Sequence, residues 1–449
     1  MAIALLSRSA AIAASNSPQD NWPQWRGPQA NGVAPTAKPA LTWSETNHVK
    51  WKVKLPGSGT ATPIVWGDQI FIQTAIPSGQ PEKTAAPEKP AVASDAPGQA
   101  SQQRRRPGGG MRSEKPTQPY QFTLLCLDRS SGAMRWQKVA REEVPHEGHH
   151  PDHGFSSYSP VTDGKLIFSY FGSRGLHCYD LAGNLRWEKD FGRMQIKNSF
   201  GEGSSPALFG NTLVVLWDHE GDDFIVALDR ESGKELWRQP RTEETSWATP
   251  LVIQHDQQTE VVTDATGKIR SYDLNSGKPL WECGGLTPNV IPSPVAGHGM
   301  VYCMSGFRGN TLLAIKLGRT GELTGSDAIA WSHHKATPYV PSPLLYGDLL
   351  YFFRANDAML SCFDAKSDSP HFEAERIEGL QGVYASPVGA DEKVYLIGRS
   401  GTVVVLRRGA KLEVLATNQL SDKFDASPAI AGNELFLRGH DRLYCIAEK

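Results

Sequence analysis

The sequence lacks an excess of charge of either sign, since 46 Lys and Arg residues stand against 48 Asp and Glu residues in 449. This balance argues against a globally basic nucleic-acid-binding protein and against a strongly acidic tail protein. Long apolar runs are also missing. None approaches the ~18 residues that a membrane-spanning helix needs, so no membrane span is expected. No stretch shows a sustained helical period, which leaves a globular composition made of short apolar segments.

Glycine and proline are abundant, at 43 and 31 residues, and this favours many turns between short strands. Residues 1–15 are small and apolar, and they have two interpretations: a signal peptide cleaved after Ala13, or a disordered N-terminus. A signal peptide would place the protein in the periplasm or outside the cell. Residues 77–119 are rich in Pro, Ala, Gln and Arg and have almost no large apolar side chains, so they are predicted to form a disordered insertion.

A Ser/Thr-Pro pair followed by apolar residues recurs eight times along the chain. Six of the seven spacings lie between 41 and 49 residues, and the remaining one, of 97, contains the insertion. The prolines are Pro63, Pro160, Pro206, Pro250, Pro294, Pro343, Pro387 and Pro428. Turn signals such as Asp163-Gly164 separate short apolar runs within a unit. Four antiparallel strands in about 45 residues are typical of a propeller blade.

A second signature, Asp-x-x-x-Gly-x-x-x-Trp, occupies the third and fourth strands of the early units. It occurs as Asp128/Gly132/Trp136, Asp229/Gly233/Trp237 and Asp273/Gly277/Trp281, and one residue shorter as Asp180/Gly183/Trp187. We expect the flat indole ring to pack between neighbouring blades. The last unit has only three strands, and residues 48–57, which contain Trp51, are predicted to supply the fourth. That pairing would close the ring and cover its strand edges.

These two patterns resemble the pyrroloquinoline-quinone-type, or quinoprotein-like, β-propeller repeat. The resemblance implies an all-β, eight-bladed propeller of four-stranded antiparallel blades, formed as a single domain by residues 41–449. The same repeat builds quinone-dependent alcohol dehydrogenases and also the non-catalytic propeller of the outer-membrane barrel-assembly machinery. The dehydrogenases carry two adjacent cysteines over the cofactor, and none of the six cysteines here are adjacent. This difference weakens the dehydrogenase interpretation.

The connection after the first blade holds four histidines within eight residues, which suggests a metal site. A turn in the third blade adds further ligand types, and imidazole suits zinc, copper or iron. The candidate ligands are His146, His149, His150, His153, Asp218, His219 and Glu220. In an enzyme, the candidate catalytic residues would be His150, His153 and Glu202. The alternative is a solvated loop whose histidines face water, because the spacing matches no standard ligand motif.

Arginines recur in the second-to-third turns of several blades, where they could form a crown on one face. With aromatic residues of the blade connections, they make a candidate site for an anionic small molecule, pyrroloquinoline quinone or a glycan. The candidates are Arg174, Arg241, Trp247, Arg308, Tyr339, Arg354, Tyr384, Arg399 and Arg438. The alternative is that the arginines pair with Glu202, Glu243, Glu244 and Asp425, and that the rings only pack.

Two functions follow from this sequence. The favoured hypothesis is an exported, monomeric propeller that acts as a non-catalytic binding scaffold for a protein or a glycan. The alternative is an enzyme whose site lies on the loop-rich face, either a quinone-dependent oxidoreductase or a metal-assisted enzyme acting on sugars. A shared fold cannot decide between the two.

Overall fold

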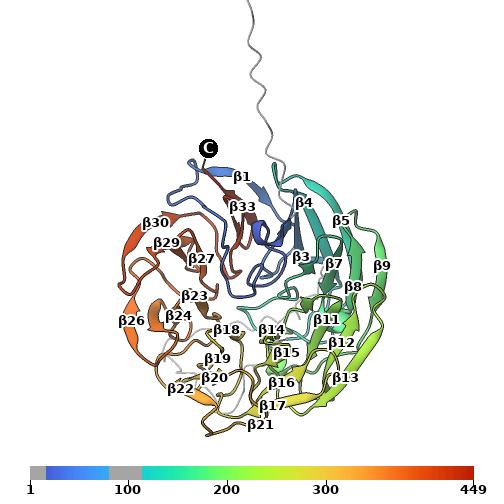
Figure 1. The fold of residues 1–449 in the computed structure, drawn as a ribbon. Coiled ribbons are helices and arrows are strands. Elements are labelled where there is room, and N and C mark those ends of the chain that lie inside the picture. Colours follow the sequence, from blue (N-terminus) through green and yellow to red (C-terminus); the bar gives the residue numbers. More distant parts are fainter. Residues whose placement is uncertain (1–16, 80–113, 449) are drawn as a thin grey trace, which may run out of the picture.

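Eight β-sheets are arranged around a ring in the computed structural model, which describes residues 17–79 and 114–448 (Figure 1). Each blade contains four antiparallel strands, which run in sequence order from the centre outward except that the N-terminal strand is outermost in the last blade. The predicted eight-bladed propeller is therefore confirmed. Residues 1–15, for which a signal peptide or a disordered N-terminus is expected, lie outside the described residues, as does most of the predicted insertion. The described ends of that insertion follow the second strand and precede the third strand of blade 1.

The first four blades each begin at the ring centre. Blade 1 comprises β2 (Ile64–Trp66), β3 (Gln69–Pro77), β4 (Tyr120–Asp128) and β5 (Met134–Glu143). Blade 2 comprises β6 (Val161–Thr162), β7 (Leu166–Tyr170), β8 (Leu176–Asp180) and β9 (Leu185–Lys189). Blade 3 comprises β10 (Ala207–Phe209), β11 (Thr212–Trp217), β12 (Asp223–Asp229) and β13 (Glu235–Arg241). Blade 4 comprises β14 (Leu251–His255), β15 (Gln258–Thr263), β16 (Ile269–Asp273) and β17 (Pro279–Cys283).

The other four blades follow the same order. Blade 5 comprises β18 (Val295–Gly297), β19 (Met300–Ser305), β20 (Thr311–Lys316) and β22 (Ile329–His333). Blade 6 comprises β23 (Leu344–Tyr346), β24 (Leu349–Phe353), β25 (Met359–Asp364) and β26 (Pro370–Arg376). Blade 7 comprises β27 (Val388–Ala390), β28 (Lys393–Ile397), β29 (Thr402–Arg407) and β30 (Val414–Gln419). Blade 8 comprises β31 (Ala429–Ala431), β32 (Glu434–Arg438), β33 (Arg442–Ile446) and β1 (Val49–Lys54).

Few elements lie outside the blades. The strand β21 (Gly321–Glu322) belongs to blade 5 in sequence but pairs in parallel with β17 of blade 4. Three short 3-10 helices are present in the described chain: η1 (Pro18–Asp20), η2 (Gly172–Arg174) and η3 (Lys197–Ser199). None of the helices in the described ranges has the length and hydropathy that crossing a membrane would require.

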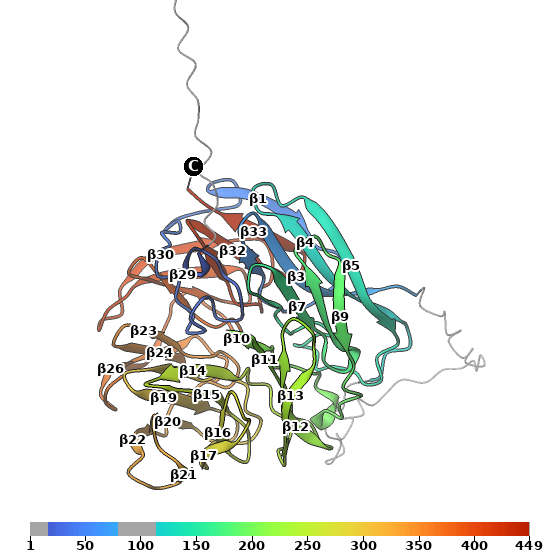
Figure 2. The ribbon, with the colours of Figure 1, turned by 45° about the vertical axis from the view of Figure 1, so that its right-hand side comes forward.

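The ring closes where the two ends of the chain meet. Strand β1 pairs antiparallel with β33, and Trp51 lies opposite Cys445. Figures 1 and 2 both show blue β1 beside red β33, so this contact holds in two views. The predicted closure of blade 8 by an N-terminal strand is therefore confirmed. Because β1 pairs with β33, the edge of β33 is covered and the first and last blades are joined.

A circle of hydrogen bonds joins the innermost strands, and it explains the Ser/Thr-Pro repeat. In each pair the backbone N–H of the Ser or Thr donates to the hydroxyl oxygen of its equivalent in the next blade, at 2.8–3.0 Å. The series runs through Thr62, Ser159, Ser205, Thr249, Ser293, Ser342, Ser386 and Ser427. Thr62 Oγ1 completes the circle by donating to Ser427 O at 3.1 Å. The proline that follows has no N–H, so it adds no donor that would need a partner.

Tryptophans of the outermost strands connect four pairs of neighbouring blades. The indole Nε1 donates to a backbone carbonyl of the next blade at 2.8–3.3 Å, from Trp51 to Arg129, Trp136 to Leu181, Trp187 to Arg230 and Trp237 to Leu274. Each ring lies against a glycine of the next blade. A Cβ there would come within 2.5–3.0 Å of a ring atom, and the glycines are Gly132, Gly183, Gly233 and Gly277. Glycine at this position therefore gives the indole its room.

Candidate functional site

The histidine-rich connection packs against the link between blades 2 and 3. His146 Nε2 is hydrogen-bonded to Met194 O at 2.7 Å, and His150 N–H donates to Phe200 O at 3.0 Å. Burial lowers the pKa of His153 to about 4. The neutral form of this imidazole is therefore favoured at neutral pH.

The far end of the same connection reaches across the ring to blade 7. Tyr384 OH donates to Asp152 Oδ2 at 3.1 Å, and Arg399 Nη2 donates to Asp152 Oδ1 at 2.9 Å. Arg399 also binds Asp425 through Nε and Nη2, at 2.6 and 3.1 Å. The connection is thus hydrogen-bonded to the link between blades 2 and 3 and also to blade 7.

The polar side chains of the acidic turn of blade 3 form hydrogen bonds and ion pairs with other residues of the protein. Asp218 forms a two-pronged ion pair with Arg241, with N–O distances of 2.7 and 3.0 Å, and both side chains are fully buried. His219 Nδ1 accepts from Gln195 N–H at 3.2 Å. Glu220 Oε1 accepts from both the N–H and the hydroxyl of Thr245, at 3.0 and 2.8 Å.

The predicted metal ligands therefore lie in two loops and carry other hydrogen bonds. His149 Nδ1 is bonded to His150 O at 2.8 Å, and His153 Nδ1 to Gly154 O at 2.9 Å. Within residues 17–79 and 114–448, no three His, Cys, Asp or Glu side chains are grouped so that they could hold a metal ion. The metal site stays a prediction.

Glu202, a candidate catalytic residue, is buried among donors. It accepts from Arg174 Nη1 at 2.7 Å, Tyr158 OH at 3.1 Å and Ser173 N–H at 2.8 Å. A Cβ on Gly172 would lie 2.0 Å from Glu202 Oε2, so the turn must approach the carboxylate as glycine. These contacts give Glu202 a role in holding the blade 2 turn against the next connection.

The arginines of the predicted crown differ in their burial and in their partners. Arg174, Arg241 and Arg399 are already paired with carboxylates, which does not fit the binding of a quinone with three carboxylates of its own. Arg438 is buried and donates to Ala61 O at 2.9 Å, and burial lowers its pKa to about 9. Two arginines lie on the surface: Arg354, paired with Asp357, and Arg308, beside the ring of Phe307.

The three candidate aromatic residues contact protein groups. Trp247 Nε1 donates to Gly201 O at 2.8 Å. Tyr339 stacks on Phe307, with ring centroids 5.0 Å apart. The guanidinium carbon of Arg399 lies 4.2 Å from the ring centroid of Tyr384. Stacking of these rings on a ligand stays a prediction.

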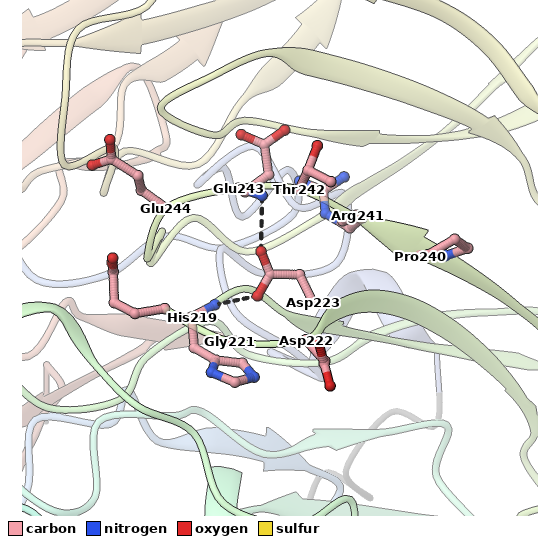
Figure 3. A pocket seen from close by; sticks show the side chains of 10 residues that line it. His219, Gly221, Asp222, Asp223, Pro240, Arg241, Thr242, Glu243 and Glu244 are labelled. Carbon is pink, nitrogen blue, oxygen red and sulfur yellow. Dashed lines mark hydrogen bonds between the residues drawn. The ribbon is translucent and has the colours of Figure 1, made fainter.

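An acidic depression lies at the outer part of blade 3, at the end of β13 (Figure 3). Its volume is about 670 Å³, and its lining includes Glu220, Asp222, Glu243 and Glu244. A neighbouring depression of about 420 Å³ shares Glu220. We call the two together the acidic groove, and its other lining residues are Glu147, Gln195, Ile196, Lys197, Asn198, His219, Gly221, Asp223, Pro240, Arg241 and Thr242.

The floor of the acidic groove is held by Asp223. Its two carboxylate oxygens accept from the backbone N–H groups of His219 and Glu243, at 3.0 and 2.8 Å, and Figure 3 shows it between these segments. Burial raises the pKa of Asp223 to about 6. This arrangement fixes the turn of blade 3 against the link to blade 4.

The groove rim carries an excess of negative charge. Glu220, Asp222 and Glu244 are exposed. Lys197 lines the groove and is not buried, and it forms an ion pair with Glu244. Glu243 pairs with Arg270. From the sequence alone, Glu220 is a candidate metal ligand, and Glu243 and Glu244 are possible partners of arginines. The register that places Asp223 opposite Arg241 brings the two acidic stretches together.

Comparison with known proteins decides the family. Residues 121–370, more than half of the chain, match the family model PQQ_2, which is described as outer membrane protein assembly factor BamB. The chain belongs to the BamB family. The resemblance to the PQQ-like repeat drawn from the sequence is thereby confirmed. A curated relative, outer membrane protein assembly factor BamB of Yersinia pestis, is 23% identical over 296 residues, which are 64% of this chain and 67% of the relative.

Two solved structures are also similar to this chain. BamB from Moraxella catarrhalis has a TM-score of 0.49 at 14% identity, covering 72% of this chain and 91% of that structure. The computationally designed Ika8 protein has a TM-score of 0.48 at 12% identity, covering 73% of this chain and 93% of that structure.

Proposed function

We propose that this BamB-family propeller is a non-catalytic scaffold that binds another protein through the acidic groove, in the periplasm. The observation that carries the proposal is the groove itself: an open depression rimmed by carboxylates, with Asp223 hydrogen-bonded to the backbone beneath it. The family membership supports a protein as the partner, since its relatives are named as assembly factors. The location follows from the signal peptide predicted at residues 1–15.

The chemistry of the groove favours a basic segment of the partner. The exposed carboxylates of Glu220, Asp222 and Glu244 face solvent beside one lysine. Carboxylates on a rim attract lysine and arginine side chains and increase the rate of association. Asp223 and the Asp218–Arg241 pair keep the turn beneath them in place, so little ordering is needed on binding.

The buried polar groups of the inner face support a scaffold over an enzyme. His153 has a lowered pKa because of burial, and Glu202 holds three donors. Both are bonded into the connections between blades. In these positions they stabilise loops, whereas the carboxylates at the rim of the acidic groove are exposed to a partner.

The test reverses two charges in the groove and compares them with two matched reversals elsewhere. The groove variant is Asp222→Lys with Glu244→Lys, and the control is Glu375→Lys with Glu378→Lys, two exposed acids around the end of blade 6. Tagged wild-type protein and both variants are used to capture proteins from the envelope fraction of the source organism.

The expected result is at least one partner, identified by mass spectrometry, that is retained by the wild type and the control and reduced ~10-fold or more by the groove variant. Unchanged circular dichroism would show that the fold is intact. Equal capture by both variants would refute the groove as the docking surface. Capture of glycan without protein would refute a protein partner.

A further inference from the structure

The start of the described chain lies inside the propeller, against its innermost strands. Trp22 and Val65 exchange two backbone hydrogen bonds, at 2.9 and 3.0 Å, and Thr162 N–H donates to Pro23 O at 2.9 Å. These bonds join the segment to blades 1 and 2. Figure 1 shows its beginning, in dark blue, between β33 and β3. We call residues 18–43 the channel segment.

The side chain of Arg26 connects the channel segment to the opposite side of the ring. Its Nη1 donates to Pro387 O at 2.7 Å and its Nη2 to Pro343 O at 2.6 Å. Both acceptors are prolines of the Ser-Pro pairs, in blades 7 and 6. Arg26 is only 2% exposed, and burial lowers its pKa to about 9.

The remaining blades are also in contact with the channel segment. Trp25 Nε1 donates to Ser293 Oγ of blade 5 at 3.3 Å. A small cavity is lined by Trp25 together with Pro206 and Pro250, which begin the inner strands of blades 3 and 4. Gly432 N–H of blade 8 donates to the backbone oxygen of residue 20 at 3.2 Å. The segment is therefore hydrogen-bonded to six of the blades, and it lines a small cavity together with the other two.

The channel segment leaves the ring between blades 7 and 8. Ala34 N–H donates to Gly389 O at 2.8 Å, and Gly389 N–H donates to Gly32 O at 2.9 Å. Tyr395 OH then donates to Pro39 O at 3.1 Å, and the ring of Tyr395 stacks on Trp43. The segment continues from there into β1, the closing strand of blade 8.

We propose that the inner wall of the ring is a peptide-binding site, and that its ligand in this protein is the channel segment of the same chain. This channel wall includes the backbone at Val65, Pro343, Pro387 and Gly389. The wall offers backbone carbonyls to a guanidinium, whose rigid fork can donate to two of them at once. It also offers strand edges at Val65 and Gly389, which add an extended peptide by backbone hydrogen bonds. The ligand class is an extended peptide that carries a Trp-Arg pair between turns.

The sequence of the channel segment fits this site closely. Gly27 has a φ of +80°, and a Cβ there would lie 2.7 Å from the Trp22 ring. Gly32 has a φ of +86°, and a Cβ there would lie 2.4 Å from Arg26 Nη2. Both turns therefore require glycine beside a large buried side chain of the segment. This site is separate from the acidic groove and does not rest on the proposed function.

The test cuts the folded, full-length protein and asks whether the channel segment stays bound. A protease site is inserted between Thr46 and Asn47, which are both exposed. After cleavage, the N-terminal fragment ending at Thr46 should co-elute with the propeller in gel filtration. A labelled synthetic peptide of residues 17–46 should then exchange into the cut protein and saturate at one peptide per chain, but should not enter the uncut protein.

Substitutions in the channel segment test whether Arg26 holds the cut fragment in place. Arg26→Met should release the fragment after cleavage, whereas the matched control Lys38→Met, which removes an exposed cation of the same segment, should retain it. If Arg26→Met does not fold, Arg26→Lys keeps the charge but loses the fork, and should release the fragment ~10-fold faster or more. Immediate loss of the wild-type fragment on cleavage would overturn the proposal. So would equal retention by the wild type and the Arg26 variants.

Discussion

The ring has two arcs whose blades are joined by different side chains. In the first arc, from the closing strand of blade 8 through blade 4, a tryptophan of the outermost strand donates to the next blade at every interface. In the second arc, from blade 4 through blade 8, none of the interfaces between described residues has this bond.

At two interfaces of the second arc, a tyrosine of the second strand donates to the next blade instead. Tyr302 OH donates to Ala365 O at 2.7 Å, and Ala365 follows Asp364 just as the acceptors of the first arc follow their aspartates. Tyr351 OH donates to Gly409 O at 3.1 Å. The carbonyl of the next blade is thus bonded in both arcs, but the donor comes from a different strand. At the interfaces of blades 5 with 6 and 6 with 7, a tyrosine hydroxyl thus supplies a donor to the next blade in place of an indole.

The interface between blades 4 and 5 has neither solution. Trp281 Nε1 donates to Glu260 Oε2 of its own blade, at 2.8 Å. Asp264 is fully buried at this interface, and the Cys303 thiol of blade 5 lies beside its carboxyl group. Burial raises the pKa of Asp264 to about 8. We expect this to be the most pH-sensitive interface of the ring.

The largest expected effect comes from Asp264→Asn. In the native protein the raised pKa keeps the Asp264 carboxyl protonated up to about pH 8, whereas in the unfolded chain it ionises near its ordinary value of 3.8. Between these values the native state holds the extra proton, so the free energy of unfolding should fall as pH rises, by ~1 kcal/mol per pH unit. The asparagine variant lacks this loss and should be more stable than the wild type at pH 8 and similar to it at pH 4.

Urea unfolding at several pH values between 4 and 8 measures this difference. Cys303→Ala is the control, because it removes the neighbouring thiol and keeps the titrating carboxyl. Parallel pH profiles for the wild type and Asp264→Asn would show that Asp264 does not control this interface.

Most of the fold was predictable from the sequence because the repeat is carried by side chains with local roles. The Ser/Thr-Pro pairs mark the inner strands, and the Asp-Gly-Trp signature marks the outer hairpins. The eight Ser/Thr-Pro pairs count the blades, and the four copies of the Asp-Gly-Trp signature show how a blade ends. The closing strand was predictable as well, since Trp51 lies in the same column as the other tryptophans.

The rest depended on contacts between residues far apart in the chain. No role was assigned to Trp25 or Arg26, because their partners, Ser293, Pro343 and Pro387, are more than 260 residues away. The sequence Trp-Pro-Gln-Trp-Arg-Gly-Pro at residues 22–28 places large side chains between turn residues, and this pattern is the sequence feature that marks the segment. The acidic groove was missed for a similar reason, because pairing of β12 with β13 brings its two acidic stretches together.

A smaller effect separates two glycines of equivalent turns in the two arcs. Gly277 in the first arc faces the Trp237 ring, where a Cβ would lie 2.5 Å away, whereas Gly318 in blade 5 has nothing within 4 Å. Both have a left-handed φ, of +71° and +76°. Gly318→Ala should therefore cost ~1 kcal/mol from the backbone alone, and Gly277→Ala ~2–4 kcal/mol because the ring must also move.

Chemical denaturation of the two glycine variants measures the comparison directly. Similar losses in both would mean that the indole shifts at little cost, and that the ring does not depend on its fit against glycine.

The smallest effect is the difference between Trp237→Phe and Trp331→Phe. Both tryptophans are largely buried, but Trp237 Nε1 donates to Leu274 O at 2.8 Å, whereas Trp331 Nε1 is buried with no acceptor among the described residues. Both changes lose a similar volume. Only Trp237→Phe leaves a buried carbonyl unpaired, while Trp331→Phe removes an unpaired donor.

Trp237→Phe should therefore be less stable than Trp331→Phe by ~1–2 kcal/mol in urea unfolding. Tyr302→Phe extends the comparison, because Tyr302 supplies the bond that Trp331 does not make, and its loss should cost ~1 kcal/mol. If Trp331→Phe proved as costly as Trp237→Phe while Tyr302→Phe had no effect, Trp331 would be the donor to the next blade. The two arcs would then use one docking residue.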